Sequence, residues 1–360
     1  ESAKVNSIDF LYLPSEIHRM DGNFMHSNVK DKDGFGLTLG YGYTPSKNFY
    51  SGIGIKYYDE RLDLNDMGYL ILNDRFMLNG RTQFKRTTFQ EGSVLRSRLF
   101  EIGYGSKFNV DSERESSNFA LKLENNFVNL SEIKAEVFYR STGRNTRITR
   151  GSKFAPFIKM PKGMGGYIDF TGPRRPTYVY GLRFERGRGS EHSPELGWGT
   201  KSRGYLKYMP TDTLSFSLTY QHQRENEWLN WYGDNLLATF QRKQRTSIVE
   251  MEWFRNNIHE LRIKAQMVAF TGREPQSFLG DLSGNLNPED IYIPPITISE
   301  LAFQVRYRYE IMPLSYLYLV YSKGGRISLQ DEEDDLFSLY RRPWNSPEKE
   351  NFTVKLRYRF

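Results

Sequence analysis

The chain has 360 residues and a mean hydropathy of −0.64. No apolar run approaches the roughly 18 residues that a transmembrane helix needs, which excludes a helical membrane protein. The 24 tyrosines, 25 phenylalanines and 30 glycines indicate a chain built mainly of β-strands. Because cysteine is absent, disulfides, thiolate metal sites and a cysteine nucleophile are excluded.

The charge of the chain excludes few classes of function. The 50 basic and 43 acidic residues give a formal net charge of +7. Lys and Arg are interleaved with Asp and Glu along the whole chain, and we therefore expect no nucleic-acid partner. The sequence opens Glu1-Ser-Ala-Lys without the charged and apolar regions of a signal peptide, so either such a peptide has been removed or the start is internal.

Alternation of apolar and polar residues is the dominant pattern. Near the C-terminus, for example, Leu356 and Tyr358 alternate with Arg357 and Arg359. In chain order, the pattern predicts seventeen strands, at residues 5–13, 18–27, 34–44, 49–58, 73–87, 95–109, 117–127, 132–141, 164–171, 176–187, 200–209, 212–223, 236–254, 258–271, 297–311, 314–323 and 349–360.

Two folds produce such alternation: a soluble sandwich and a transmembrane barrel. Segments of about ten residues match the roughly 9–11 that cross a bilayer, whereas soluble strands average about five or six. Tyr and Phe gather toward the segment ends, and the terminal Phe360 resembles the C-terminal signal of bacterial outer-membrane barrels. The pattern favours an all-β, transmembrane antiparallel outer-membrane β-barrel, located in the bacterial outer membrane.

The connections support the barrel and bear on its completeness. Long connections, at about 59–72, 141–163, 187–199, 224–235, 272–296 and 324–348, alternate with short turns. We expect residues 1–360 to form one barrel domain with no separate soluble domain. Because a single-chain barrel has an even strand number, seventeen strands predict the C-terminal portion of a barrel of 18 or more, unless one strand has been missed or merged.

The polar side of the strands predicts a lumen lined by charge. A cationic stretch in the C-terminal strands would favour anionic solutes. Alternatively, opposite charges on neighbouring strands neutralise one another, which we favour for any single pair. The predicted lumen-lining residues are Arg183, Arg262, Lys264, Arg306, Arg308, Lys355, Arg357, Arg359, Glu260 and Glu310.

Four tryptophans fall in the predicted external loops: Trp198, Trp228, Trp231 and Trp344. Exposed aromatic rings stack on sugars or on a protein partner, or else anchor a chain at a membrane interface, and both interpretations stay open. The five histidines are scattered without an evident nucleophile beside them, so we expect no enzyme. No cofactor and no metal site are expected.

One short motif carries a resemblance to a known family. The segment Asp63-Leu-Asn-Asp-Met-Gly-Tyr-Leu70 contains Asn65, Asp66, Gly68 and Tyr69, and Asn145–Ser152 adds a second element. These residues resemble a family of uncharacterised bacterial outer-membrane β-barrels whose members carry an N-terminal carbohydrate-binding-like domain of the xylanase type. That domain is absent here, and the resemblance implies no established activity.

The sequence therefore predicts a porin-like channel or translocation pore with a polar, partly cationic lumen. The alternative is a surface-binding or scaffold barrel, closed by its loops, that anchors a carbohydrate-binding domain or partner protein. The expected partners are outer-membrane lipid and lipopolysaccharide, with a further polypeptide completing the barrel and a carbohydrate or surface protein as additional candidates.

Overall fold

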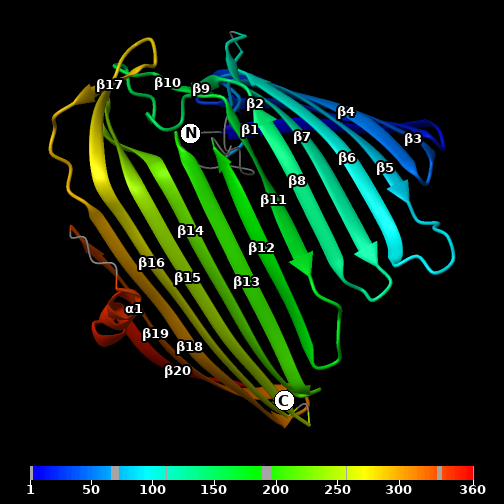
Figure 1. Ribbon diagram of the computed structural model, residues 1–360, viewed down its shortest axis with the longest axis vertical. Coiled ribbons are helices and arrows are strands. Elements are labelled where there is room, and N and C mark those ends of the chain that lie inside the picture. The colour runs from blue at the N-terminus through cyan, green and yellow to red at the C-terminus, as the bar shows by residue number, and fades with distance from the viewer. Residues whose placement is uncertain are drawn as a thin grey trace. The chain divides into compact units, whose positions relative to one another are not determined.

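The computed structural model describes residues 3–65, 73–110, 112–188, 196–256, 258–330 and 335–359. These residues form twenty strands and one helix (Figure 1). The elements are β1 (Ala3–Ser15), β2 (His18–Val29), β3 (Lys32–Ser46), β4 (Phe49–Tyr58), β5 (Arg75–Arg86), β6 (Leu95–Phe108), β7 (Arg114–Phe127), β8 (Glu132–Arg140), β9 (Gly143–Asn145), β10 (Ile158–Met160), β11 (Gly163–Thr171), β12 (Tyr178–Arg188), β13 (Trp198–Thr211), β14 (Leu214–Gly233), β15 (Leu236–Arg255), β16 (His259–Gly280), β17 (Leu286–Glu289), β18 (Ile296–Met312), β19 (Ser315–Leu329), α1 (Leu336–Asn345) and β20 (Lys349–Arg357).

The seventeen predicted strands are confirmed. Within the described residues, β9 and β10 form a separate two-stranded ladder, and β17 is a four-residue strand paired with β16. The other seventeen correspond one to one with the predicted segments, and β4 has the predicted bounds. Local period-two alternation is therefore sufficient to locate these strands.

The chain divides into two compact units. Unit 1 comprises residues 1–128, 134–166 and 282–285, and unit 2 comprises residues 129–133, 167–281 and 286–360. In unit 1, each of β1 to β6 pairs antiparallel with the next strand. In unit 2, consecutive antiparallel pairs join β12 to β16, and further pairs join β16 to β18, β18 to β19 and β19 to β20.

The longest strands lie in unit 2, where β14 and β15 each have 20 residues and β16 has 22. The prediction of a loop at 224–235 is therefore wrong, and that at 272–296 is wrong for its first residues. The strands continue because Phe240 and Ile293 form a buried cluster against which Trp228 packs. Such contacts between distant segments leave no periodic trace in the sequence. Figure 1 shows β13 to β16 running side by side.

The helix α1 was also missed, because 324–348 was predicted as a loop. The side chain of Asp335 caps it by accepting from the backbone N–H of Ser338 at 2.7 Å. Leu339 is completely buried, and the Tyr340 hydroxyl lies 3.1 Å from the hydroxyl of Ser247. Burial raises the pKa of Tyr340. Helix α1 packs on β18, β19 and β16, and it is not long and apolar enough to cross a membrane.

Each strand has an apolar face and a polar face. On β12, Leu182 and Phe184 are 61% and 54% exposed, while Arg183 between them points to the polar face. The same exposure recurs on β20, where Leu356 is 61% exposed. Rows of exposed apolar side chains on many strands require hydrocarbon rather than water beside them. The fold is the all-β antiparallel fold of a transmembrane outer-membrane β-barrel.

The two ends of the strands differ in the length of their connections. At the turn end, consecutive strands join through short hairpins, as between Met312 and Ser315, and at the opposite loop end lie the long connections. Completely buried side chains gather at the loop end, where they include Leu62 and Ile158 in unit 1 and Phe240 and Leu339 in unit 2. Most of the completely buried side chains among the described residues therefore lie at the loop ends.

Candidate functional site

The polar face of unit 2 carries a ladder of paired charges. Glu260, whose side chain is 7% exposed, forms ion pairs with the Nε of Arg262 at 2.5 Å and the Nε of Arg308 at 2.9 Å. One row further, the ammonium of Lys264 lies 2.7 Å from a carboxylate oxygen of Glu250. The charges of these predicted lumen residues are therefore neutralised in ion pairs with residues on the same or neighbouring strands, and this pairing stiffens the strands.

A row of tyrosines on β19 separates the predicted basic residues of β18 from those of β20. Arg308 and Lys355 lie on either side of Tyr318 in the register, and Glu310 and Arg357 lie on either side of Tyr316.

The guanidinium of Arg308 stacks at 5.2 Å over Tyr316, and that of Arg306 at 5.4 Å over Tyr318. Arg359 lies beyond the end of β20, and its N–H donates to the hydroxyl of Ser315. The predicted cationic group is therefore two basic rows separated by aromatic rings.

A polar cavity of about 260 Å³ lies on the same face over β11 to β14. Arg183 is held within it by Asp169 at 3.4 Å and Glu185 at 3.3 Å, with its guanidinium 3.7 Å from the ring centre of Tyr167. Gly181 makes room for the cavity's aromatic wall, since a Cβ there would lie 2.3 Å from the ring of Tyr205. The lining residues are Asp169, Gly181, Leu182, Arg183, Lys201, Arg203, Tyr205 and Gln221.

Sequence reasoning did not identify Lys201 and Arg203 as site residues. Both stand on β13, and Arg203 lies directly opposite Arg183 in the register. Two arginines facing one another on adjacent strands would repel unless carboxylates or a bound anion compensate them. The signal was available as the alternation of Lys201, Arg203, Tyr205 and Lys207, but the pairing partner of each residue was not.

The four tryptophans predicted in external loops lie in strands or in helix α1. Trp228 and Trp231 lie within strand β14, and neither is fully exposed. Trp228 packs against Phe240 and Phe270, and the guanidinium of Arg242 lies 5.3 Å from its ring. A strand continues there because Arg242 also pairs at 2.9 Å with Glu225, which is almost fully buried.

The other two tryptophans are partly exposed at the loop end. Trp198 opens β13 and is 40% exposed, with Arg186 over its ring. Trp344 lies in α1, edge-on to Phe303 and 5.0 Å from the ammonium of Lys323. These two remain candidates for a surface contact.

The family motif is only partly described. Asp66, Gly68 and Tyr69 lie outside the described residues, whereas Asn65 donates through its side chain to Asp63 at 2.9 Å. At the first residue of the motif, the backbone N–H of Asp63 donates to the hydroxyl of Ser27 at 3.0 Å. The start of the motif is thus fastened onto β2, and no ligand contact is implied for it.

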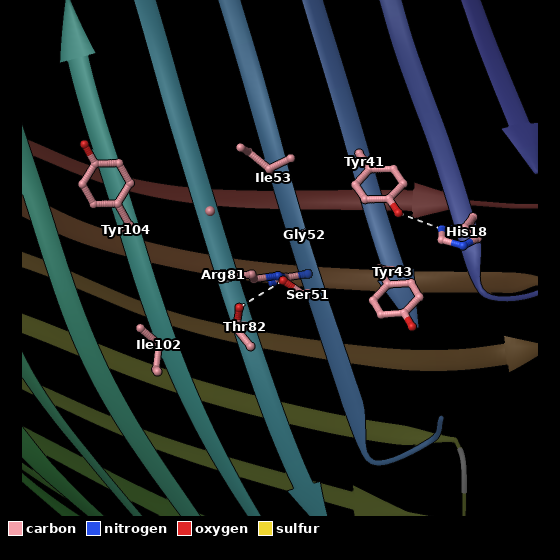
Figure 2. A pocket seen from close by; sticks show the side chains of 11 residues that line it. His18, Tyr41, Tyr43, Ser51, Gly52, Ile53, Arg81, Thr82, Ile102 and Tyr104 are labelled. Carbon is pink, nitrogen blue, oxygen red and sulfur yellow. Dashed lines mark hydrogen bonds between the residues drawn. The ribbon is translucent and has the colours of Figure 1, made fainter. Parts of the chain in front are cut away.

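A groove of about 610 Å³ lies on the apolar face of unit 1 near the turn end, over β2 to β6 (Figure 2). Its floor contains Ser51 and Thr82, whose hydroxyls lie 3.1 Å apart. On one side, Nδ1 of His18 is hydrogen-bonded to the hydroxyl of Tyr41 at 2.7 Å, and the His18 ring stacks on Tyr43 at 5.1 Å.

The same histidine arrangement recurs in unit 2. Nδ1 of His259 lies 2.7 Å from the hydroxyl of Tyr307, and its ring stacks on Tyr309 at 5.1 Å. Both histidines begin a strand at the turn end. Side chains with an apolar ring and a polar tip suit a membrane–water interface, which indicates a structural role for both clusters.

The antiparallel strands, with one apolar and one polar face, define a protein of the outer-membrane β-barrel class. A family described as a domain of unknown function (DUF5916) matches residues 3–360. The chain therefore belongs to the DUF5916 family. No curated protein matches it.

Several solved structures have a similar chain path. The siderophore receptor PirA from Pseudomonas aeruginosa is 8% identical with a TM-score of 0.46, over 91% of this chain and 69% of that one. PirA from Acinetobacter baumannii is 9% identical with a TM-score of 0.41, over 98% and 70%. OmpT, an outer membrane protein of Vibrio cholerae, is 10% identical with a TM-score of 0.31, over 93% and 96%. Likeness at this level carries no information about function.

Proposed function

We propose that the protein is an outer-membrane channel or translocation pore for polar solutes, with a preference for anions. The observation that carries this proposal is the cavity lined by Arg183, Lys201 and Arg203, in which Asp169 is the one lining carboxylate. Most of the charge on the neighbouring ladder is neutralised in pairs, so this cavity is where a passing solute meets excess positive charge.

Purified protein in planar lipid bilayers tests the proposal through the reversal potential in a salt gradient. We expect conductance that favours chloride over potassium. Because Arg203 is exposed and lies in the cavity, Arg203→Glu should shift the reversal potential toward cation selectivity. Arg174→Glu makes the same charge change in the exposed connection between β11 and β12, and serves as the matched control.

Two outcomes would contradict the proposal. Protein that inserts but conducts no ions would reject the pore. Conductance that responds equally to the changes at Arg203 and Arg174 would leave the pore but reject the role of the cavity.

A surface-binding barrel is the second candidate, and a specific observation favours it. A cavity of about 670 Å³ lies between residues 275–278 and 288–295 at the loop end of unit 2. Tyr292 on its rim is 84% exposed, and Glu289 and Asp290 supply carboxylate oxygens. An exposed ring beside hydrogen-bond acceptors suits a sugar, and a glycan array with the wild type and Tyr292→Ala tests this. Equal signals, or none, would reject it.

A further inference from the structure

The groove over β2 to β6 lies on the apolar face of unit 1 (Figure 2). Ile53 and Tyr104 in its wall are 51% and 46% exposed, and Phe84 beyond its turn end is 46% exposed. Exposed apolar side chains on this face require hydrocarbon beside them. The groove is therefore continuous with the lipid-facing surface, and hydrocarbon rather than water fills it.

The histidine arrangement that the two units share shows which residues make the groove. In unit 2, the two strands next to the tyrosines of this arrangement carry four branched apolar side chains, which are Leu317, Leu319, Val354 and Leu356. In unit 1, three of the four corresponding positions carry small or hydroxyl side chains, which are Ser51, Gly80 and Thr82. The groove therefore lies where unit 2 places larger apolar side chains.

Packing within the chain does not require a glycine at position 80. A Cβ there would meet its nearest atom, the carbonyl oxygen of Gly52, at 3.7 Å, which is an ordinary contact. A glycine inside a strand weakens the strand, and it often marks a place where another molecule approaches closely. Gly80 thus leaves room that no other part of unit 1 needs for its own packing.

The floor of the groove carries two hydroxyl groups on this lipid-facing side. The hydroxyls of Ser51 and Thr82 lie 3.1 Å apart, and neither forms another hydrogen bond within the described residues. One hydroxyl proton is used between the two groups, so one donor is left. Because hydrocarbon offers no acceptor, an unused donor is costly there unless a ligand accepts from it. The occupant should therefore carry an acceptor oxygen next to its hydrocarbon.

A row of aromatic rings at the turn end indicates the depth of that donor. The ring centres of Phe49 and Phe84 are 5.2 Å apart, and those of Phe84 and Phe100 are 6.4 Å apart. Aromatic girdles of this kind mark the level of the lipid headgroups. Thr82 lies two residues farther from the turn end than Phe84, which is about 7 Å along the strand. The ester carbonyls of a phospholipid lie at this depth, because they join its acyl chains to its headgroup.

The charge and the length of the groove also suit an acyl chain. The guanidinium of Arg81 lies 5.1 Å from the ring centre of Tyr50, which alternates with Ser51 and so stands on the polar face. This cation therefore points away from the groove. Crossing from β2 to β6 covers four strand spacings, or about 19 Å, which exceeds the roughly 15 Å of hydrocarbon in one leaflet.

We propose that this groove binds one glycerophospholipid, with an acyl chain lying across β2 to β6 and an ester carbonyl oxygen accepting a hydrogen bond from the Ser51–Thr82 pair. The short turns of outer-membrane barrels face the periplasm, so the lipid comes from the periplasmic leaflet. The site lies on the apolar face and is independent of whether the polar face lines an open pore.

Native mass spectrometry of the purified full chain in a non-ionic detergent tests the site, with palmitoyl-oleoyl phosphatidylethanolamine as the probe. We expect one lipid to bind more tightly than all others. Gly80→Val should weaken its binding about tenfold or more, because the added side chain displaces at least two methylene groups of the acyl chain. This variant should fold, since valine favours a strand and its Cβ has room.

Gly204→Val is the matched control, because Gly204 lies between Leu182 and Tyr220 on the apolar face of unit 2, outside the groove. Its Cβ would meet the nearest atom, a methyl group of Leu182, at 3.4 Å. We expect lipid affinity within about twofold of the wild type for this control. A wild type without a tightly bound lipid would overturn the proposal. Equal weakening by the two substitutions, or retention of lipopolysaccharide alone, would overturn it as well.

An ether-linked phosphatidylethanolamine tests the hydrogen bond, because it lacks the ester carbonyl. The wild type should bind this lipid about fivefold more weakly than the ester-linked one. The double variant Ser51→Ala, Thr82→Val removes both hydroxyls and should bind the two lipids equally. Equal binding of the two lipids by the wild type would overturn the role of the hydroxyl pair.

Discussion

The polar faces of the two units differ in how many charged side chains they carry. In unit 2, Glu260 is shared by Arg262 and Arg308, and Glu250 is matched to Lys264. In unit 1, Arg75 pairs with Glu115 at 3.1 Å, and the polar face nearby is largely glycine, as at Gly40, Gly42, Gly52 and Gly54. A ladder of matched charges stiffens the wall of unit 2, whereas a face of glycines leaves the backbone of unit 1 bare of long side chains.

Removing the shared carboxylate of unit 2 should have the largest effect. Glu260→Gln removes the carboxylate that pairs with Arg308 and leaves Arg262 only the longer pair with Glu252 at 3.8 Å, and it should cost about 3 kcal/mol. The measurement is urea unfolding of the protein in detergent, followed by tryptophan fluorescence.

Glu310→Gln is the control for this change, because Glu310 stands on the polar face of β18 and forms no ion pair among the described residues. If both variants unfold at the same urea concentration, the shared pair is not a stabilising feature of this wall.

Separating the segment 143–160 from β7 should have the next largest effect. A Cβ in Gly143→Ala would overlap the Glu115 carbonyl oxygen, so the segment must lift, at a cost of about 1–3 kcal/mol. The loss should appear in the same urea unfolding measurement. Gly80→Ala is the control, since its Cβ would meet the nearest described atom at 3.7 Å. Equal unfolding midpoints for the two variants would show that the close contact between Gly143 and Glu115 does not limit the stability of the chain.

The smallest effect is expected where an arginine of unit 2 rests on an aromatic ring instead of a carboxylate. Tyr318→Leu removes the ring 5.4 Å from Arg306 and should cost about 0.5–1 kcal/mol in the same unfolding measurement. Tyr318→Phe keeps the ring and should retain most of the stability. A larger loss in the Phe variant than in the Leu variant would exclude the ring as the stabilising partner.

The strands could be predicted from the sequence because the alternation of apolar and polar residues that defines a strand's two faces is a local pattern. Residues 49–58, for example, alternate with the period of a strand and are bounded by a turn on one side. The face on which each charge stands follows from the same alternation, as for Arg183 between Leu182 and Phe184 on β12.

What the sequence could not supply were contacts between distant segments. The pairing of Glu225 with Arg242, the packing of Trp228 on Phe240, and the continuation of β14 beyond residue 224 depend on one another. Helix α1 likewise depends on the surface that Leu339 meets. The pair of Arg75 with Glu115 was missed because it joins β5 to β7, and no spacing in the sequence connects the two strands.

The length of β14, β15 and β16 has one further consequence. At roughly 3.3 Å per residue, strands of 20 to 22 residues are about twice as long as a tilted crossing of the hydrocarbon layer requires. About half of each strand therefore stands clear of the lipid as a stiff, hydrogen-bonded ribbon. A molecule that approaches the segment between β16 and β18 therefore meets it well away from the bilayer surface, on strands that extend beyond the membrane.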